Sequence, residues 1–104
     1  MKEITVQELE KAINSKTEFT LLDVRENYEY KIGHLNCVHI PMAEIPNRAE
    51  ELDNDKMTYV MCKTGKRAAA VANFLATNFK FNEIAVVCGG VEAYANEIDQ
   101  SIEV

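Results

Sequence analysis

The chain has 104 residues, which is enough for one domain and too few for two. Hydrophobic residues make up 47% and charged residues 27%, an ordinary globular composition that excludes a disordered chain. Seventeen acidic and eleven basic residues give a net charge of −6, which repels the phosphates of nucleic acids. No apolar stretch approaches the ~20 residues that span a bilayer, and the first residues lack the apolar core of a secretory signal. We therefore expect a soluble, cytoplasmic single domain over residues 1–104 that binds neither nucleic acid nor membrane.

Strand-like and helix-like segments alternate along the whole chain. Thr5 and Glu8 have the spacing of a capping box, which predicts a helix that extends to about Asn14, with Ile4 as a short apolar lead-in. The remaining pattern predicts helices over residues 26–32, 44–52, 67–78 and 91–98, and strands over residues 19–24, 38–40, 57–62 and 84–88. Continuous apolar strands between helices indicate a mainly parallel sheet of about five strands with helices on both faces, a three-layer α/β/α domain.

Three cysteines, at positions 37, 62 and 88, are an odd number and do not form a disulfide framework. Cys62 has Tyr59 and Gly65 three residues away on either side, which excludes a thioredoxin-type motif and a zinc-binding pair. We expect no metal and no cofactor. Each thiol is therefore either a small core residue or a reactive group.

Cys62 stands at the end of an apolar run, and the next predicted helix starts about five residues later. Parallel sheets bind ligands beyond the carboxyl ends of their strands, where such a loop turns its N–H groups inward and the helix directs its positive end to the same space. Lys63, Lys66 and Arg67 add positive charge. Together these features favour a thiolate. On the residues alone, a buried cysteine that merely ends a strand is an equally good interpretation.

Four motifs in a fixed order resemble the rhodanese-like sulfurtransferases. The first is Leu22-Asp23-Val24-Arg25-Glu26 with Glu29-Tyr30 and Gly33-His34-Leu35, the second is Ile40-Pro41, the third is Cys62-Lys63-Thr64-Gly65-Lys66-Arg67, and the fourth is Gly89-Gly90-Val91-Glu92-Ala93-Tyr94. The third resembles the active-site loop of the family, and the resemblance covers residues 4 to 98. Two positions depart from the usual pattern, because Tyr94 replaces a common tryptophan and Cys88 replaces a charged or polar residue.

The resemblance implies an α/β/α fold and a function in sulfur transfer. Cys62 would be the catalytic nucleophile that takes the outer sulfur of a small anionic donor such as thiosulfate and passes it to a thiophilic acceptor, for example a thiol or a thioredoxin-like protein. The substrate-binding residues would be those of the loop, namely Lys63, Thr64, Gly65, Lys66 and Arg67. The physical logic agrees, since backbone N–H groups can hold a sulfur anion without a metal and Gly65 permits the backbone conformation that such a loop needs.

Other polar residues near these motifs are expected to support the structure. Asp23, at a strand end near the site, and Arg25, paired with Glu29 or another carboxylate, would brace the fold, and surface pairs of that kind contribute little each. We expect His34 to be a hydrogen-bonded structural histidine and Cys37 a small buried residue.

Cys88 leaves two interpretations open. It ends the strand expected beside the one that ends at Cys62, and neighbouring strands are only ~4.8 Å apart, so that its thiol could resolve a Cys62 persulfide as a disulfide. A small apolar residue before a Gly-Gly turn needs no chemistry, and we expect the structural role.

Two other functions compete with sulfur transfer. A cysteine phosphatase or arsenate reductase uses seven residues from Cys to Arg, whereas Arg67 closes this loop at six and Ala68 occupies the seventh position. A non-catalytic rhodanese-like sulfur-carrier or protein-binding module usually lacks the cysteine, which is present here. A phosphate-binding loop of the Walker type is excluded, because it needs Gly where the chain has Val60 and Ser or Thr where it has Arg67.

Overall fold

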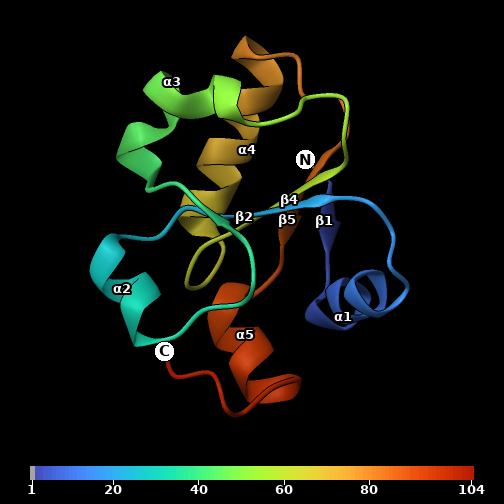
Figure 1. Ribbon diagram of the computed structural model, residues 1–104, viewed down its shortest axis with the longest axis vertical. Coiled ribbons are helices and arrows are strands. Elements are labelled where there is room, and N and C mark those ends of the chain that lie inside the picture. The colour runs from blue at the N-terminus through green and yellow to red at the C-terminus, as the bar shows by residue number, and fades with distance from the viewer. Residues whose placement is uncertain (1) are drawn as a thin grey trace.

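The computed structural model describes residues 2–104 and shows one twisted sheet between two layers of helices (Figure 1). Its strands are β1 (Glu3–Ile4), β2 (Thr20–Asp23), β3 (Val38–His39), β4 (Thr58–Met61) and β5 (Ile84–Val87). They lie in the order β1-β5-β4-β2-β3, and every pairing is parallel. The α-helices are α1 (Val6–Asn14), α2 (Asn27–Ile32), α3 (Ile45–Arg48), α4 (Lys66–Asn78) and α5 (Gly90–Glu97). The predicted α/β class with a five-stranded parallel sheet is confirmed.

Apolar side chains on the two faces of the sheet form two separate cores. Val60 of β4 packs with residues of α3 and α4, such as Ile45 and Val71. Its neighbour Met61 points to the other face, where it packs with residues of α1 and α5, such as Leu9. Successive side chains of a strand face opposite sides, so a strand buried on both faces reads as a continuous apolar run. This explains why the β4 segment shows no alternation in the sequence.

The strand order places the end of β4 near the middle of the carboxyl edge of the sheet. Val60 is in register with Leu22 of β2 on one side and with Val86 of β5 on the other. Cys62, which directly follows β4, therefore lies between the segments that follow β2 and β5. Those segments lead into α2 and α5, and both contact the cysteine loop.

Two predicted elements differ from the structure. Ile4 is part of the two-residue strand β1 and is in register with Val87 of β5; the other residue of β1, Glu3, is charged and exposed, so no apolar run marks the strand. The segment predicted as one helix over residues 44–52 is divided into a 3-10 turn at Met42–Glu44, the short helix α3 and a second 3-10 turn at Ala49–Glu51. Pro46 has no N–H and is compatible only with the first turn of a helix, so α3 cannot extend further toward its N-terminus.

The start of α1 agrees with the predicted capping box. The Thr5 hydroxyl accepts a hydrogen bond from the Glu8 N–H at 3.1 Å, and the Glu8 carboxylate accepts one from the Thr5 N–H at 2.9 Å. Among residues 2–104, the structure contains no helix with the length and apolar character required to cross a bilayer.

Candidate active site

The Cys62 thiol lies inside the loop that joins β4 to α4, and the residue is only 1% exposed. Its Sγ accepts hydrogen bonds from the Gly65 N–H at 3.1 Å and from the Ala68 N–H at 3.4 Å. Gly65 has φ +119°, a conformation that a side chain would strain, and it is the N-cap of α4. Two backbone donors at the positive end of a helix therefore converge on one sulfur, which stabilises negative charge there.

The Ala68 N–H was missed by the sequence analysis, which took the loop to end at Arg67. Ala68 lies in the first turn of α4, and the first four N–H groups of a helix have no partner within the helix. That general property is the signal that could have identified it.

Gly89 and Gly90, the N-cap and the first residue of α5, allow the chain to pass close to the cysteine loop. The Cys62 carbonyl accepts a hydrogen bond from the Val91 N–H at 2.9 Å, and the Lys63 carbonyl accepts one from the Glu92 N–H at 3.1 Å. Gly90 has φ +60°, and a Cβ atom at this position would collide with the Cys62 carbonyl oxygen. The first turn of α5 thus holds the loop in place, and only glycine fits at the contact.

Arg67 is held by Glu29 of α2. Its two terminal nitrogens donate to the two carboxylate oxygens at 2.7 and 2.9 Å, and the Glu26 N–H donates to the same carboxylate at 3.0 Å. The hydrogen bonds from Arg67 lower the pKa of Glu29 to about 2, although partial burial opposes this shift. Glu29 in turn raises the pKa of Arg67 above its already high value. Arg67 is therefore compensated, and is not the free cation that the sequence analysis expected at the loop.

Asp23 and Arg25 form a buried ion pair rather than a surface pair. The side chain of Arg25 is 1% exposed and that of Asp23 is 0% exposed. Nε of Arg25 lies 3.0 Å from both Asp23 carboxylate oxygens, and Nη2 donates to Oδ2 at 2.8 Å. The same Nη2 donates to the Gly33 carbonyl at 2.8 Å, just after α2 ends. The pair connects the end of β2 to the end of α2, and Asp23, not Glu29, is the carboxylate that Arg25 binds.

The remaining loop residues are at the surface. Lys63, Thr64 and Lys66 are exposed, and neither lysine forms an ion pair with any other residue of the described chain. These two ammonium groups are available to attract an anion to the loop.

An aromatic stack lies between α2 and β3. The ring of Tyr30 is sandwiched between His34 at 3.8 Å and His39 at 4.1 Å, with nearly parallel planes. A ring nitrogen of His34 lies 2.7 Å from the Tyr30 carbonyl, and one of His39 lies 2.8 Å from the Arg25 carbonyl. His34 is thus hydrogen-bonded to the backbone, as expected, although it is exposed, and His39 is half-buried.

The other two thiols lie in environments that disfavour a thiolate. Cys37 is half-buried rather than fully buried as expected, and burial together with the Asp23 charge raises its pKa to about 12. Cys88 is also half-buried, and desolvation and the neighbouring Glu3 carboxylate raise its pKa. Neither environment resembles that of Cys62, whose sulfur accepts hydrogen bonds from two backbone N–H groups.

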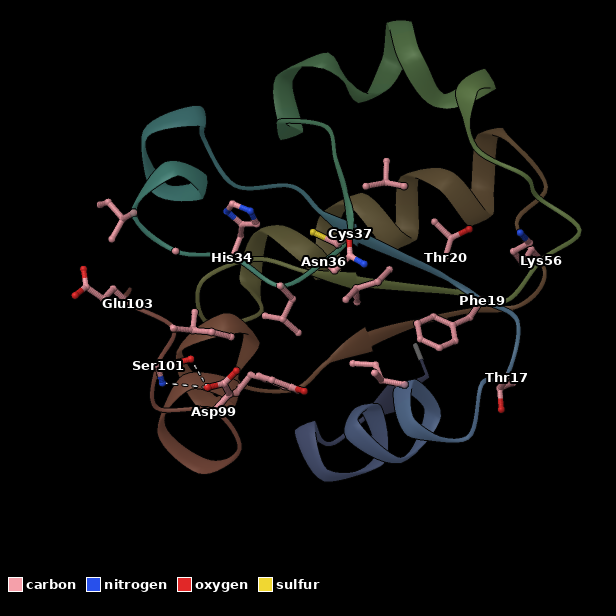
Figure 2. Close-up of a pocket in the computed structure, with 18 residues that line it drawn as sticks. Thr17, Phe19, Thr20, His34, Asn36, Cys37, Lys56, Asp99, Ser101 and Glu103 are labelled. Carbon is pink, nitrogen blue, oxygen red and sulfur yellow. Dashed lines mark hydrogen bonds between the residues drawn. The ribbon is translucent and has the colours of Figure 1, made fainter.

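The larger of two described cavities does not include the cysteine loop. It is a groove of about 1110 Å³ between the end of α1, the start of β2, the segment before β3 and the last residues of the chain. Figure 2 shows Phe19 and Thr20 on one side of this groove and His34, Asn36 and Cys37 on another. The candidate site therefore rests on the geometry of the loop and not on the size of a cavity.

Residues 5–97 match the family model described as the rhodanese-like domain. The chain belongs to the rhodanese-like domain family. The match covers α1 to α5 and includes the cysteine loop. The resemblance inferred from the four sequence motifs is thus confirmed.

Similar proteins and structures agree with this assignment. The chain is 35% identical to "Putative sulfurtransferase YtwF" of Bacillus subtilis (strain 168) over 99 residues, which cover 93% of each protein. A crystal structure of a rhodanese-related protein from Thermoplasma volcanium has a TM-score of 0.83 and 31% identity, and the match covers 94% of both chains. A rhodanese-like domain protein from Staphylococcus aureus has a TM-score of 0.84 and 31% identity over 100% of this chain and 98% of that one.

Other relatives are longer than this rhodanese-like domain. It is 35% identical to "Putative sulfur carrier protein YrkF" of B. subtilis (strain 168), of which the match spans 38%. It is 34% identical to "Adenylyltransferase and sulfurtransferase UBA4" of Debaryomyces hansenii, of which the match spans 25%. Their names describe roles in sulfur transfer.

Proposed function

We propose that this rhodanese-like domain is a sulfurtransferase that carries sulfane sulfur as a persulfide on Cys62. The observation that carries the proposal is the convergence of the Gly65 and Ala68 N–H groups on Sγ at the positive end of α4. Sulfur transfer needs a nucleophilic thiolate and hydrogen-bond donors that stabilise a sulfur anion. Backbone N–H groups of a loop can act as these donors.

The reaction has two steps. The Cys62 thiolate attacks the outer sulfur of thiosulfate, a new S–S bond forms, and the old S–S bond breaks as its electron pair leaves with sulfite. An acceptor then attacks the outer sulfur of the Cys62 persulfide and regenerates the thiolate. Cyanide serves as an acceptor in the test tube, and a small thiol or a thioredoxin-like protein would serve in the cell. Because the thiolate must stay reduced, we place the reaction in a reducing compartment such as the cytoplasm.

The loop residues have separate roles in this proposal. Lys63 and Lys66 attract the anionic donor, while Thr64 and Gly65 shape the loop. Arg67, held by Glu29, fixes the start of α4. Asp23 and Arg25 hold the end of α2, the helix whose Glu29 binds Arg67.

The features of the loop disfavour the two alternative functions. A phosphatase would need a wider loop for a tetrahedral phosphate, and Arg67 is committed to Glu29. A protein-binding module without catalysis would not need two backbone donors around a buried cysteine.

The test is a thiosulfate:cyanide assay combined with mass spectrometry of the protein after exposure to thiosulfate. We expect the wild type to gain one sulfur on Cys62 and to form thiocyanate. Cys62→Ser should do neither, while Cys37→Ser, the matched control, should do both. Thiocyanate formation by Cys62→Ser at the wild-type rate would contradict the proposal. Hydrolysis of p-nitrophenyl phosphate without any sulfur transfer would favour the phosphatase.

A further inference from the structure

The larger cavity of the protein takes no part in the proposed sulfur transfer. It has a volume of about 1110 Å³, and none of residues 62–67, the cysteine loop, lines it. We call it the β2 groove, because the start of β2 lines it. Figure 2 shows Lys56 at one end of the groove, Asp99 and Glu103 at the other, and Thr20 between them. A groove of this size, apart from the reacting thiol, is a candidate binding site of its own.

Apolar side chains line both the floor and the rim of the β2 groove. Leu21 and Leu35 line it and belong to the core that the sheet forms with α1 and α5. Three of the six large apolar residues that are exposed in residues 2–104 also line it, namely Ile13 at 39%, Ile32 at 52% and Val38 at 43%. Large apolar side chains gathered at one exposed place are typical of a binding surface, whereas single ones scattered over a surface need no explanation.

Strand β2 has an unpaired edge along this groove. It has four residues, and β3 pairs only with the last two of them. The Thr20 N–H donates to the Met57 carbonyl at 2.8 Å, on the side of β4. Successive residues of a strand direct their backbone groups to opposite sides, so the N–H groups of Phe19 and Leu21 face the other side, where β3 has not yet begun. Such an edge is a template on which another extended chain can pair.

The uncompensated charge of the β2 groove is negative. Lys56, at one end, is paired with Glu18 at 3.5 Å. Asp99 and Glu103, at the other end, form no ion pair with any other residue among 2–104. Hydrogen bonds from Ser101 lower the pKa of Asp99 and keep its carboxylate charged. The groove therefore favours a partner that brings a basic residue to this end.

We propose that the β2 groove binds an extended peptide segment of a partner protein as an added strand. The peptide backbone pairs with the open edge at Phe19 and Leu21, its apolar side chains rest on the floor of the groove, and a lysine or arginine lies beside Asp99 and Glu103. A second copy of this chain is a poorer partner, because each copy carries a net charge of −6. The surface brings a partner to the domain and leaves the cysteine loop uncovered.

The test is an NMR titration of the ¹⁵N-labelled protein with three capped peptides. The first is acetyl-Lys-Val-Thr-Val-Thr-Lys-amide, the second has glutamate in place of both lysines, and the third is the lysine peptide N-methylated at its four central residues. We expect the lysine peptide to bind saturably and to shift the amide signals of residues 19–21 and 38, but not those of residues 62–67. The glutamate peptide should bind roughly five- to tenfold more weakly, because it is repelled by the two carboxylates. The N-methylated peptide should not bind, because it lacks the N–H donors that an added strand needs.

Variants of the groove test the two contributions separately. Glu103→Lys should reduce the preference for the lysine peptide over the glutamate peptide by roughly two- to fivefold, whereas Glu50→Lys, the same change of charge outside the groove, should not. Ile13→Ser and Val38→Ser should each weaken binding of the lysine peptide about threefold, because less apolar surface is buried. Met42→Ser is the matched control, since Met42 is similarly exposed, at 38%, and does not line the groove.

Equal binding of the lysine and glutamate peptides, shifts centred on the cysteine loop, or binding of none of the peptides would overturn the inference. Shifts at the groove that grow with protein concentration in the absence of peptide would assign the groove to a second copy of the chain, and would overturn it as well. Peptide binding does not require sulfur transfer, so the thiosulfate:cyanide assay decides the proposed function separately.

Discussion

The carboxylate of Glu29 accepts two hydrogen bonds from the guanidinium group of Arg67, at 2.7 and 2.9 Å, although 38 residues separate the two in the chain. This contact joins α2 to the first turn of α4, where the cysteine loop ends. It also compensates the positive charge of Arg67. In the proposed reaction, the attraction of an anionic donor is therefore left to Lys63 and Lys66.

We expect Glu29→Gln to lower the free energy of unfolding at pH 7 by about 1 kcal/mol, since the pair is partly exposed. The folded-state pKa of Glu29, about 2, lies below its ordinary value of 4.5. The stabilisation is therefore fully present above pH 4.5 and is lost as the pH falls toward 2. Urea unfolding of both proteins at pH 7 and at pH 3 measures this. A difference between them that grows as the pH is lowered would contradict the assignment.

Loss of the buried ion pair should be far more costly. Asp23→Asn removes the charge that compensates Arg25 in a region without solvent, and we expect a destabilisation of about 3–5 kcal/mol. Glu44→Gln is the matched control, because it breaks the exposed pair between Glu44 and Arg48 and should cost less than about 1 kcal/mol. Urea unfolding at pH 7 measures both. Equal effects would show that burial does not determine the strength of the pair at Asp23.

Cys62 should be the thiol that reacts first with a small alkylating reagent at neutral pH. Two backbone N–H groups at the start of α4 donate to the Cys62 sulfur, whereas burial and Asp23 raise the pKa of Cys37 to about 12. Brief treatment with iodoacetamide followed by peptide mass spectrometry gives the order of labelling. Labelling of Cys37 before Cys62 would be inconsistent with the proposed nucleophile.

The two free lysines of the loop should affect substrate capture more than turnover. We expect Lys63→Ala and Lys66→Ala to raise KM for thiosulfate several-fold with a smaller change in kcat, because each removes a charge that attracts the anion. Wild-type KM should rise with ionic strength, since exposed charges are screened by salt. Lys11→Ala, on the exposed surface of α1, makes the same change of charge away from the loop and should have little effect. Unchanged kinetics in both loop variants would remove this role.

Cys88 should not take part in the sulfur-transfer cycle. Its backbone N–H donates to the Ile4 carbonyl at 2.8 Å, and desolvation together with the neighbouring Glu3 carboxylate raises the pKa of its thiol. We expect Cys88→Ser to transfer sulfur to cyanide at the wild-type rate. Peptide mapping of the wild type after thiosulfate treatment should detect no disulfide between Cys62 and Cys88, and such a disulfide would support the resolving role instead.

Local patterns were sufficient to predict the layered fold and the place of Cys62 between the end of a strand and the start of a helix. A strand buried on both faces is mostly apolar and leaves a continuous apolar run in the sequence, whereas a helix that covers it carries an apolar stripe and leaves a periodic pattern. The capping box at Thr5 and Glu8 and the glycine at position 65 are equally local, because each reports the backbone conformation at its own position. Strand β1 was not predicted because only one of its two residues, Ile4, is apolar, and Glu3 is charged and exposed.

The partners of the charged side chains were decided by the tertiary structure. Arg25 binds Asp23, which is only two residues away, whereas Glu29 binds Arg67, which is 38 residues away and comes within reach only in the folded chain. The Ala68 N–H became a donor to Cys62 because the loop folds back on the first turn of α4. The backbone of Glu103 packs against Gly33, a contact between residues 70 apart in the numbering. The interaction between two charges, or between an N–H group and its acceptor, depends on their distance in space, and their separation along the chain does not determine that distance.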